Sequence, residues 1–288
     1  MLNAHLEAFL SHLVQGRGLS VATQAAYRFE LSRFITFVMD SGVDDPTLVT
    51  SNSIADYLEG MTVAPPTKAR ARSAIKSFFS YLIKRKVVVL DPTVNLDTIK
   101  LPIKRSPYLV RRDWERLLAV IEQSATPYFR QRDLTLVQLL LMTGLRRGEV
   151  VRLKVQDIDL DELIILVTRK GGSEGVVPIH PELAKTLRVY LAGTMGKPHE
   201  ALFMSKLGSA LSAASVWHIV KHYAGLAELD SKLTVHSLRH SFASHLLDQN
   251  VALPHIQGLL GHRSPATTSR YVHFNNRQLA AALTSVNF

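Results

Sequence analysis

Two stretches of the sequence combine residue types that suit the binding of an anion, and the first surrounds Arg146. "TGLRRGEV" (143–150) places Arg146 two residues after Gly144, and Glu149 follows three residues later. Gly144 can end one helix with a sharp turn, so that Arg146 begins the next helix. An arginine there can share an anion with the free N–H groups of that helix, while Glu149 braces the guanidinium. An ordinary surface ion pair of Arg146 is the alternative.

The second stretch, "HSLRH" (236–240), places a histidine and an arginine three residues apart. At this spacing His236 and Arg239 lie on one face of a helix. An imidazolium beside a guanidinium is unfavourable unless a negative group lies between them, and a phosphate meets that need. A structural histidine is the alternative. His240, one turn after His236, is a supporting candidate.

Lys170 precedes two glycines between "ELIILVT" and "EGVVPI", which are both rich in β-branched residues. This pattern predicts a β-hairpin with Lys170 near its turn. A lysine on a glycine-rich tip can follow a DNA groove and deliver a proton, which arginine cannot do at its pKa. A solvated turn lysine is the alternative.

A final stretch, "GHRSPATTSRYVHF" (261–274), contains basic residues and one tyrosine but no acid. Pro265 and the Thr267–Thr268 pair let the chain bend between His262 and Tyr271, so that both side chains can reach one phosphate. Tyrosine, with a pKa near 10, becomes a good nucleophile only when cations favour its anion. A packed aromatic residue is the alternative for Tyr271. Six candidate residues could thus act together to cleave a phosphodiester without a metal: Arg146, Lys170, His236, Arg239, His262 and Tyr271.

Other kinds of site find little support in the sequence. The pairs His218/His222 and His236/His240 have the spacing of helical metal ligands, but no further ligand is near in sequence. The glycine-rich segments do not match a nucleotide-binding phosphate loop. The absence of cysteine excludes disulfides, a thiolate nucleophile and cysteine-ligated zinc. We therefore expect neither a metal nor a cofactor.

Apolar residues at helical spacing predict helices through the first hundred residues. We expect an N-terminal helical domain over 1–96, a linker over 97–112 that contains two prolines, and a catalytic domain over 113–288. That last domain reads as mainly helical with one small sheet and a short apolar helix at its C-terminus. Basic residues on the flank of the fourth helix and in the linker are DNA-binding candidates: Lys68, Arg72, Lys76, Lys104 and Arg105. A solvated helix edge is the alternative for the three helix residues.

Composition agrees with a DNA-binding protein without proving it. The 288 residues include 34 Lys and Arg against 24 Asp and Glu, a net charge of +10 that is spread over both predicted domains. Hydrophobic residues make up 47% of the chain, enough for packed cores. No apolar run reaches the ~18 residues that a membrane helix needs, so we expect a cytoplasmic, nucleoid-associated protein without a membrane partner.

Four motifs together resemble the tyrosine recombinases of the phage integrase family, most nearly the Xer-type enzymes in size. They are "TGLRRGEV", "RKGGSEGVVPI", "HSLRHSFASHLL" and "LLGHRSPATTSRYVH", in the family's order and spacing. Arg147 and Gly148 depart from the usual aliphatic–serine pair, and Arg169 replaces a frequent glycine. The resemblance implies these roles: the arginine pair, Arg146 and Arg239; the general acid, Lys170; an acid–base histidine, His236; a phosphate-binding histidine, His262; and the nucleophile, Tyr271.

The resemblance also implies an integrase-like fold, with a SAM-like core-binding domain and a mainly helical catalytic domain that holds a small antiparallel β-sheet. It implies cleavage of double-stranded DNA sites through a 3′-phosphotyrosine link and a four-way junction, without ATP or metal. The assembly would be a homotetramer, or a heterotetramer with a related recombinase, with an accessory or activating protein as a further partner. The C-terminal helix would dock on its own domain or on a neighbouring protomer.

Two other functions stay open at this point. A type IB topoisomerase would use similar chemistry to relax one duplex, although the "LLGH" spacing favours recombination. A DNA-binding regulator would need neither Tyr271 nor Lys170, so the intact set of six residues argues against it.

Overall fold

The computed structural model describes residues 1–16, 21–99, 108–169, 172–194 and 201–261. It divides the chain into two units, Met1–Lys104 and Arg105–Phe288. This division falls inside residues 97–112, where the sequence predicts a linker.

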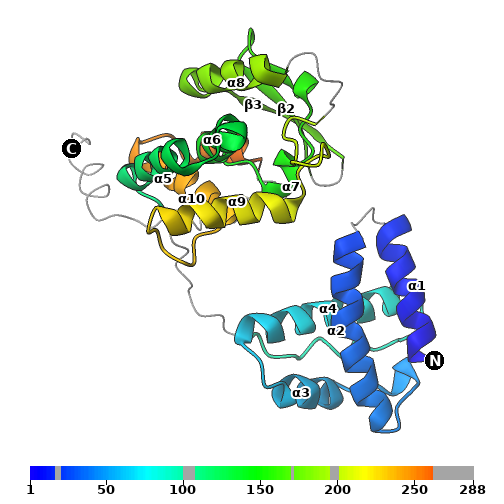
Figure 1. The fold of residues 1–288 in the computed structure, drawn as a ribbon. Coiled ribbons are helices and arrows are strands. Elements are labelled where there is room, and N and C mark those ends of the chain that lie inside the picture. Colours follow the sequence, from blue (N-terminus) through cyan, green and yellow to red (C-terminus); the bar gives the residue numbers. More distant parts are fainter. Residues whose placement is uncertain (17–20, 100–107, 170–171, 195–200, 262–288) are drawn as a thin grey trace, which may run out of the picture. The chain divides into compact units, whose positions relative to one another are not determined.

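The first unit consists of helices packed around one apolar core (Figure 1). Its elements are α1 (Leu2–Gln15), α2 (Val21–Asp40), a 3-10 turn (Pro46–Leu48), α3 (Ser51–Gly60) and α4 (Pro65–Lys84). Thr50 caps α3, because its side chain accepts a hydrogen bond from the Ser53 N–H. In return, the Ser53 hydroxyl accepts a hydrogen bond from the Thr50 N–H. The apolar stripe of α4 is buried as its spacing predicts, with Phe78 and Phe79 fully enclosed.

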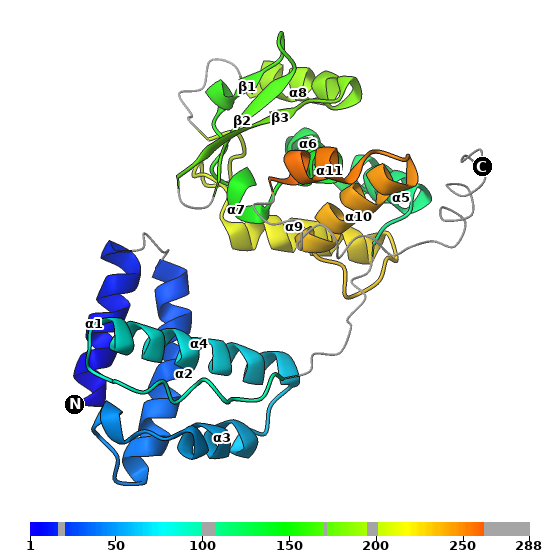
Figure 2. The same cartoon turned by 180° about the vertical axis from the view of Figure 1, so that it is seen from behind.

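The second unit holds helices and a small sheet (Figures 1 and 2). Its helices are α5 (Arg111–Ser124), α6 (Pro127–Thr143), α7 (Arg147–Val150), α8 (Pro181–Thr194), α9 (Ala213–Leu226), α10 (Val235–Asp248) and α11 (Leu253–Leu260), with a 3-10 turn at Val155–Asp157. The sheet is antiparallel in the order β1 (Ile158–Asp159), β2 (Ile164–Thr168) and β3 (Glu174–Pro178). The predicted hairpin is confirmed as β2 and β3, with Ile165 opposite Val177. The fold class is therefore confirmed.

Helix α6 is the centre of the second unit. It contacts α5, α8 and α10, and four of its leucines are buried: Leu136, Leu139, Leu140 and Leu141. Buried apolar residues on several sides of a helix place that part of it inside a domain. The C-terminal end of this buried helix is consequently a fixed point, and the site is built from it. Among the residues that the structure describes, no helix is long and apolar enough to cross a membrane.

Candidate active site

The site begins where α6 ends at Gly144. This glycine has a φ of 62° in the left-handed region, and a Cβ at its position would lie 2.6 Å from the Phe242 ring. Glycine is therefore required both by the backbone conformation and by close packing. The chain turns at once, and Arg146 becomes the N-cap of α7. The sequence predicts this turn correctly.

Glu149 holds Arg146 at two points. Its Oε1 accepts a hydrogen bond from Arg146 Nη1 at 2.8 Å, and its Oε2 accepts one from the Arg146 backbone N–H at 2.7 Å. The Glu149 side chain is only 5% exposed, whereas that of Arg146 is 42% exposed. The predicted bracing contact is thus a direct ion pair, which leaves the rest of the guanidinium open to a ligand.

Arg239 is held differently, because it is buried and bonded to the backbone. The residue is 3% exposed on α10. Its Nη1 donates to the Gly144 carbonyl at 2.6 Å and its Nη2 to the Leu260 carbonyl at 2.7 Å. These two bonds tie α10 to the end of α6 and to the end of α11. They also use neutral acceptors, so they do not cancel the positive charge.

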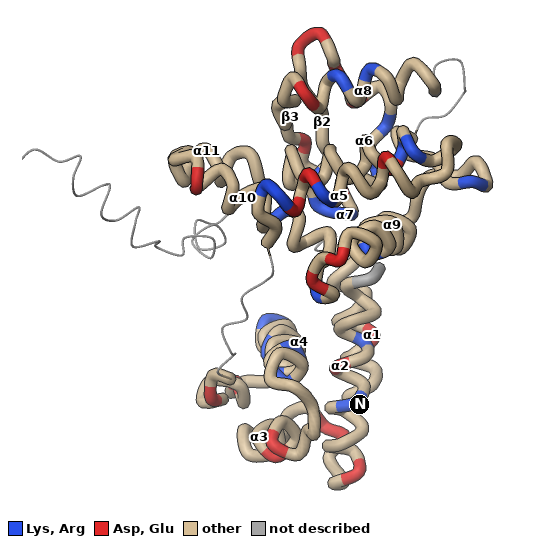
Figure 3. The backbone as a smooth tube through the Cα atoms, turned by 60° about the vertical axis from the view of Figure 1, so that its left-hand side comes forward, with Lys and Arg blue, Asp and Glu red and all other residues tan. Residues whose placement is uncertain are grey.

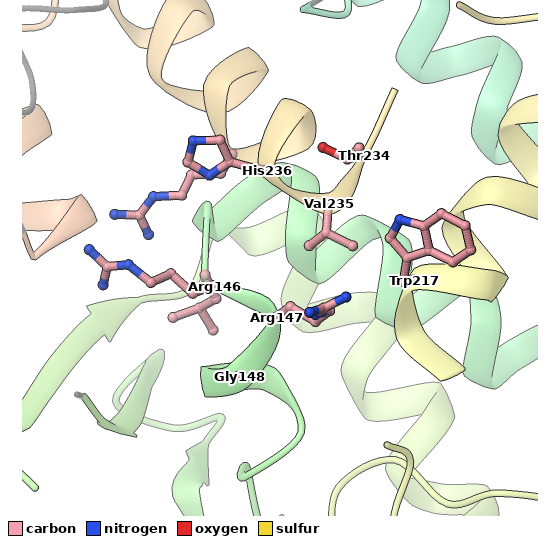
Figure 4. Close-up of a pocket in the computed structure, with 9 residues that line it drawn as sticks. Arg146, Arg147, Gly148, Trp217, Thr234, Val235 and His236 are labelled. Atoms are coloured by element: carbon pink, nitrogen blue, oxygen red, sulfur yellow. The ribbon is translucent and has the colours of Figure 1, made fainter. Parts of the chain in front are cut away.

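His236 and the two arginines meet in one cavity of about 430 Å³ (Figure 4). The capping box of Thr234 and Ser237 starts α10 and sets the direction in which His236 leaves the helix. Nine described residues line the cavity, and none of them is a carboxylate: Leu145, Arg146, Arg147, Gly148, Trp217, Thr234, Val235, His236 and Arg239. The structure thus brings three of the six catalytic candidates together in a cationic pocket.

The other three candidates, Lys170, His262 and Tyr271, lie outside the described residues. Their neighbours in the chain show where each segment leaves the described structure. The Arg169 N–H bonds the Ser173 carbonyl across the end of β2 and β3, at 2.7 Å. Gly261 ends α11 in the left-handed region, directly after Leu260, whose carbonyl binds Arg239.

His240 is buried next to this site but does not line the cavity. The centroid of its ring lies 6.0 Å from the centroid of the Tyr108 ring. Beside it, the Ser241 hydroxyl accepts a hydrogen bond from the Leu109 N–H at 2.7 Å and donates one to Ser237. The start of the second unit is therefore fastened to the helix that carries His236 and Arg239.

Figure 3 shows Lys and Arg along α4, and two of these side chains make contacts that the sequence does not predict. Arg72 Nη2 donates to the Leu96 carbonyl at 2.7 Å, and Lys68 Nζ donates to the Glu59 carbonyl at 3.3 Å. Lys76 is exposed, and Lys104 and Arg105 lie outside the described residues. Arg72 therefore has a structural contact within its own unit, and DNA binding by this group stays a prediction.

Six lining residues were not candidates from the sequence, and two of these have large side chains that can contact a ligand, Arg147 and Trp217. Arg147 departs from the pattern of the family that the sequence resembles, and that departure was a usable signal. No feature of the sequence indicates a role for Trp217, because its place in the pocket depends on the packing of α9 against α7. In the described ranges, no three His, Asp or Glu side chains gather into a possible metal site.

Comparison with known proteins covers both units. Residues 108–278 match the phage integrase family and residues 6–86 match the phage integrase N-terminal SAM-like domain. The chain is 38% identical to the tyrosine recombinase XerC of Roseiflexus castenholzii, over 96% of this chain and 90% of the relative. It is 31% identical to the tyrosine recombinase XerD of Staphylococcus epidermidis, over 96% of each chain.

Solved structures agree with these matches. The XerH site-specific recombinase, bound to a palindromic difH substrate in a post-cleavage complex, is similar with a TM-score of 0.78 and 25% identity, over 93% of this chain and 81% of that chain. A lambda integrase dimer on a core site shares the fold, with a TM-score of 0.73, 20% identity and 96% of each chain covered. The chain therefore belongs to the phage integrase family and is a tyrosine site-specific recombinase.

Proposed function

We propose that this recombinase cleaves each DNA strand by forming a covalent 3′-phosphotyrosine bond at Tyr271. The observation that carries the proposal is the cationic pocket, in which Arg146, Arg239 and His236 converge and none of the nine described lining residues is acidic. A pocket of this kind stabilises the negative charge that develops on the phosphate oxygens during attack at phosphorus. The positive guanidinium groups in the pocket favour an anionic ligand such as a phosphate over a neutral one.

The chemical step assigns one role to each residue. The Tyr271 oxygen bonds to phosphorus and its proton passes to a base, for which His236 is the candidate in the pocket. The bond from phosphorus to the 5′ oxygen breaks, and Lys170 donates a proton to that oxygen. His262 adds a hydrogen bond to the phosphate. No phosphodiester energy is lost, so the step requires no ATP.

The free 5′-hydroxyl then attacks the phosphotyrosine of the partner strand, which releases Tyr271 and joins the exchanged strands. Exchange of one strand from each of two duplexes produces a four-way junction, and exchange of the two remaining strands resolves it. We propose that four protomers cleave the four strands. The helical unit 1–96 and the catalytic unit 113–288 would both bind duplex DNA. The basic candidates would contact the phosphate backbone: Lys68, Arg72, Lys76, Lys104 and Arg105.

A nicked duplex that traps the covalent complex tests the nucleophile and the acid separately. The full chain should form a denaturant-resistant adduct, and Tyr271→Phe should form none, since the ring lacks the attacking oxygen. Lys170→Ala should cleave a normal duplex slowly, but should recover on a duplex with sulfur as the 5′ bridging atom. A thiolate leaves without protonation because the thiol pKa is near 8.5.

The outcomes of this assay separate the rival functions. Absence of any adduct with the unaltered chain would contradict a recombinase mechanism and favour a DNA-binding regulator. Relaxation of supercoiled DNA without strand exchange between two duplexes would favour a topoisomerase. Failure of sulfur substitution to rescue Lys170→Ala would remove Lys170 as the general acid.

A further inference from the structure

The cavity that contains the arginine pair extends beyond it to a third arginine. Arg147 is the first residue of α7, and it lines the same cavity as Trp217 of α9. Figure 4 shows the Arg147 side chain directed toward Trp217, while Arg146 and His236 lie on the other side of the pocket. The two consecutive arginines therefore diverge, and we infer that they serve different ligand groups.

The Arg147 guanidinium differs from the other two in having no partner among the residues that the structure describes. Arg146 is paired with Glu149, and Arg239 bonds two carbonyls. The side chain of Arg147 is exposed, and it makes no hydrogen bond, ion pair or ring contact within the described part of the chain. A positive group directed into a cavity without a partner is available to an anion that enters from outside.

Trp217 adds a flat apolar surface on this side of the cavity. Its indole is half-buried, and Lys221 Nζ lies 5.8 Å from the ring centroid. Lys221 also donates to the Ser231 carbonyl, which holds the ammonium beside the indole. An apolar ring flanked by two cations matches the sugar and the phosphates of a DNA strand.

We propose that Arg147 and Trp217 form a second DNA-backbone subsite, which binds the phosphate next to the scissile one on the cleaved strand. The inference rests on the proposed function, because it requires the scissile phosphate at Arg146 and Arg239. The cavity of about 430 Å³ has room for more than one phosphate, because the five heavy atoms of a phosphate, at about 30 Å³ for each water-sized atom, fill about 150 Å³. Because neighbouring phosphates are joined by one nucleotide, a phosphate at the arginine pair brings the next one toward Arg147.

The subsite would add affinity for the strand rather than take part in the chemistry. Arg147 does not touch the reacting atoms in this scheme, so its loss should weaken DNA binding and leave the rate of adduct formation at saturating DNA nearly unchanged. We expect Arg147→Leu, which introduces the aliphatic side chain common at this position, to bind on the order of tenfold more weakly at low salt. The slope of the logarithm of the DNA-binding constant against the logarithm of the salt concentration should become less steep by about 0.9.

Neutral phosphate analogues locate the contact directly. The DNA is a duplex that the full chain has selected from random sequence. Two versions are prepared, and each carries a single methylphosphonate at the phosphate on one side or the other of the cleavage position. A methylphosphonate at one of these two positions should weaken binding of the unaltered chain. The same methylphosphonate should not weaken binding of Arg147→Leu, because that variant already lacks the contact. Lys185→Ala, which removes an exposed lysine of α8 that pairs with Glu182, is the matched control and should behave like the unaltered chain.

Tryptophan fluorescence gives a second readout that does not depend on removing Arg147. The chain has two tryptophans, so Trp114→Phe leaves Trp217 as the only reporter. Binding of the selected duplex should change the Trp217 emission and protect it from acrylamide. An unchanged emission, or equal methylphosphonate effects in Arg147→Leu and the unaltered chain, would refute the subsite. Either result can occur while the adduct still forms at Tyr271, so failure of the subsite is distinguishable from failure of the proposed function.

Discussion

Replacing Arg239 by lysine tests whether the buried guanidinium holds the site together as well as binding phosphate. Arg239→Lys keeps the positive charge but replaces a planar group by one ammonium at the end of a shorter side chain. The arginine reaches two carbonyls that belong to different segments, Gly144 at 2.6 Å and Leu260 at 2.7 Å. One ammonium cannot take the position of both nitrogens, so at least one carbonyl loses its donor.

The expected loss of stability follows from burial. Arg239 is 3% exposed, so water does not replace the missing donor. A hydrogen bond that involves a charged group contributes about 1.5–3 kcal/mol, and an unpaired buried carbonyl costs about 1–3 kcal/mol. These ranges describe the same lost contact, so we expect Arg239→Lys to lower the free energy of unfolding of the second unit by about 2 kcal/mol.

Urea unfolding followed by tryptophan fluorescence measures this quantity for the second unit alone, because Trp114 and Trp217 both lie there. Arg146→Lys is the matched control, since that arginine lines the same cavity but is 42% exposed. Its ion pair with Glu149 is partly solvated, so the control should lose less than about 1 kcal/mol. Equal unfolding of Arg239→Lys and the unaltered chain, or an equal loss in the control, would refute the structural role of Arg239.

Three further substitutions test other parts of the structure. Gly144→Ala should destabilise the second unit by about 2–4 kcal/mol in urea, because it adds left-handed strain and a Cβ that meets Phe242; a loss below 1 kcal/mol would contradict this. Glu149→Gln should change stability by less than about 1 kcal/mol but slow adduct formation about tenfold, since Arg146 loses its charged brace; unchanged cleavage would contradict this. Burial raises the pKa of Tyr190 to about 12, so the phenol's stabilising contribution is full below pH 10 and decreases as the pH rises to 12. Tyr190→Phe should therefore reduce the alkaline loss of stability, measured by urea unfolding at several pH values, and an unchanged pH profile would contradict the assignment.

Local rules were enough to predict the parts of the site that neighbouring residues determine. The turn at Gly144, the bracing of Arg146 by Glu149 and the hairpin all follow from residue types a few positions apart. The common face of His236 and Arg239 follows from helical spacing alone. In these cases the interacting groups lie on one element or on two adjacent ones.

Contacts between distant segments could not be predicted in the same way. The carbonyl partners of Arg239 lie 95 and 21 residues away in the chain, and Arg72 bonds a carbonyl 24 residues away. The presence of Trp217 beside Arg147 depends on how α9 packs on α7. The strand β1 has two residues, too short to show any alternation.

The residue that becomes attached to DNA can be identified directly by mass spectrometry. After the nicked duplex has trapped the covalent complex, trypsin should release the peptide "YVHFNNR" (271–277), because Arg270 precedes Tyr271 and Arg277 ends the peptide. We expect this peptide to carry the 3′-phosphate of the cleaved strand on its tyrosine, and we expect Arg146→Ala to yield the same linkage more slowly. Linkage of the DNA to any other residue, with peptide 271–277 unmodified, would contradict a mechanism in which the cationic pocket presents the phosphate to Tyr271.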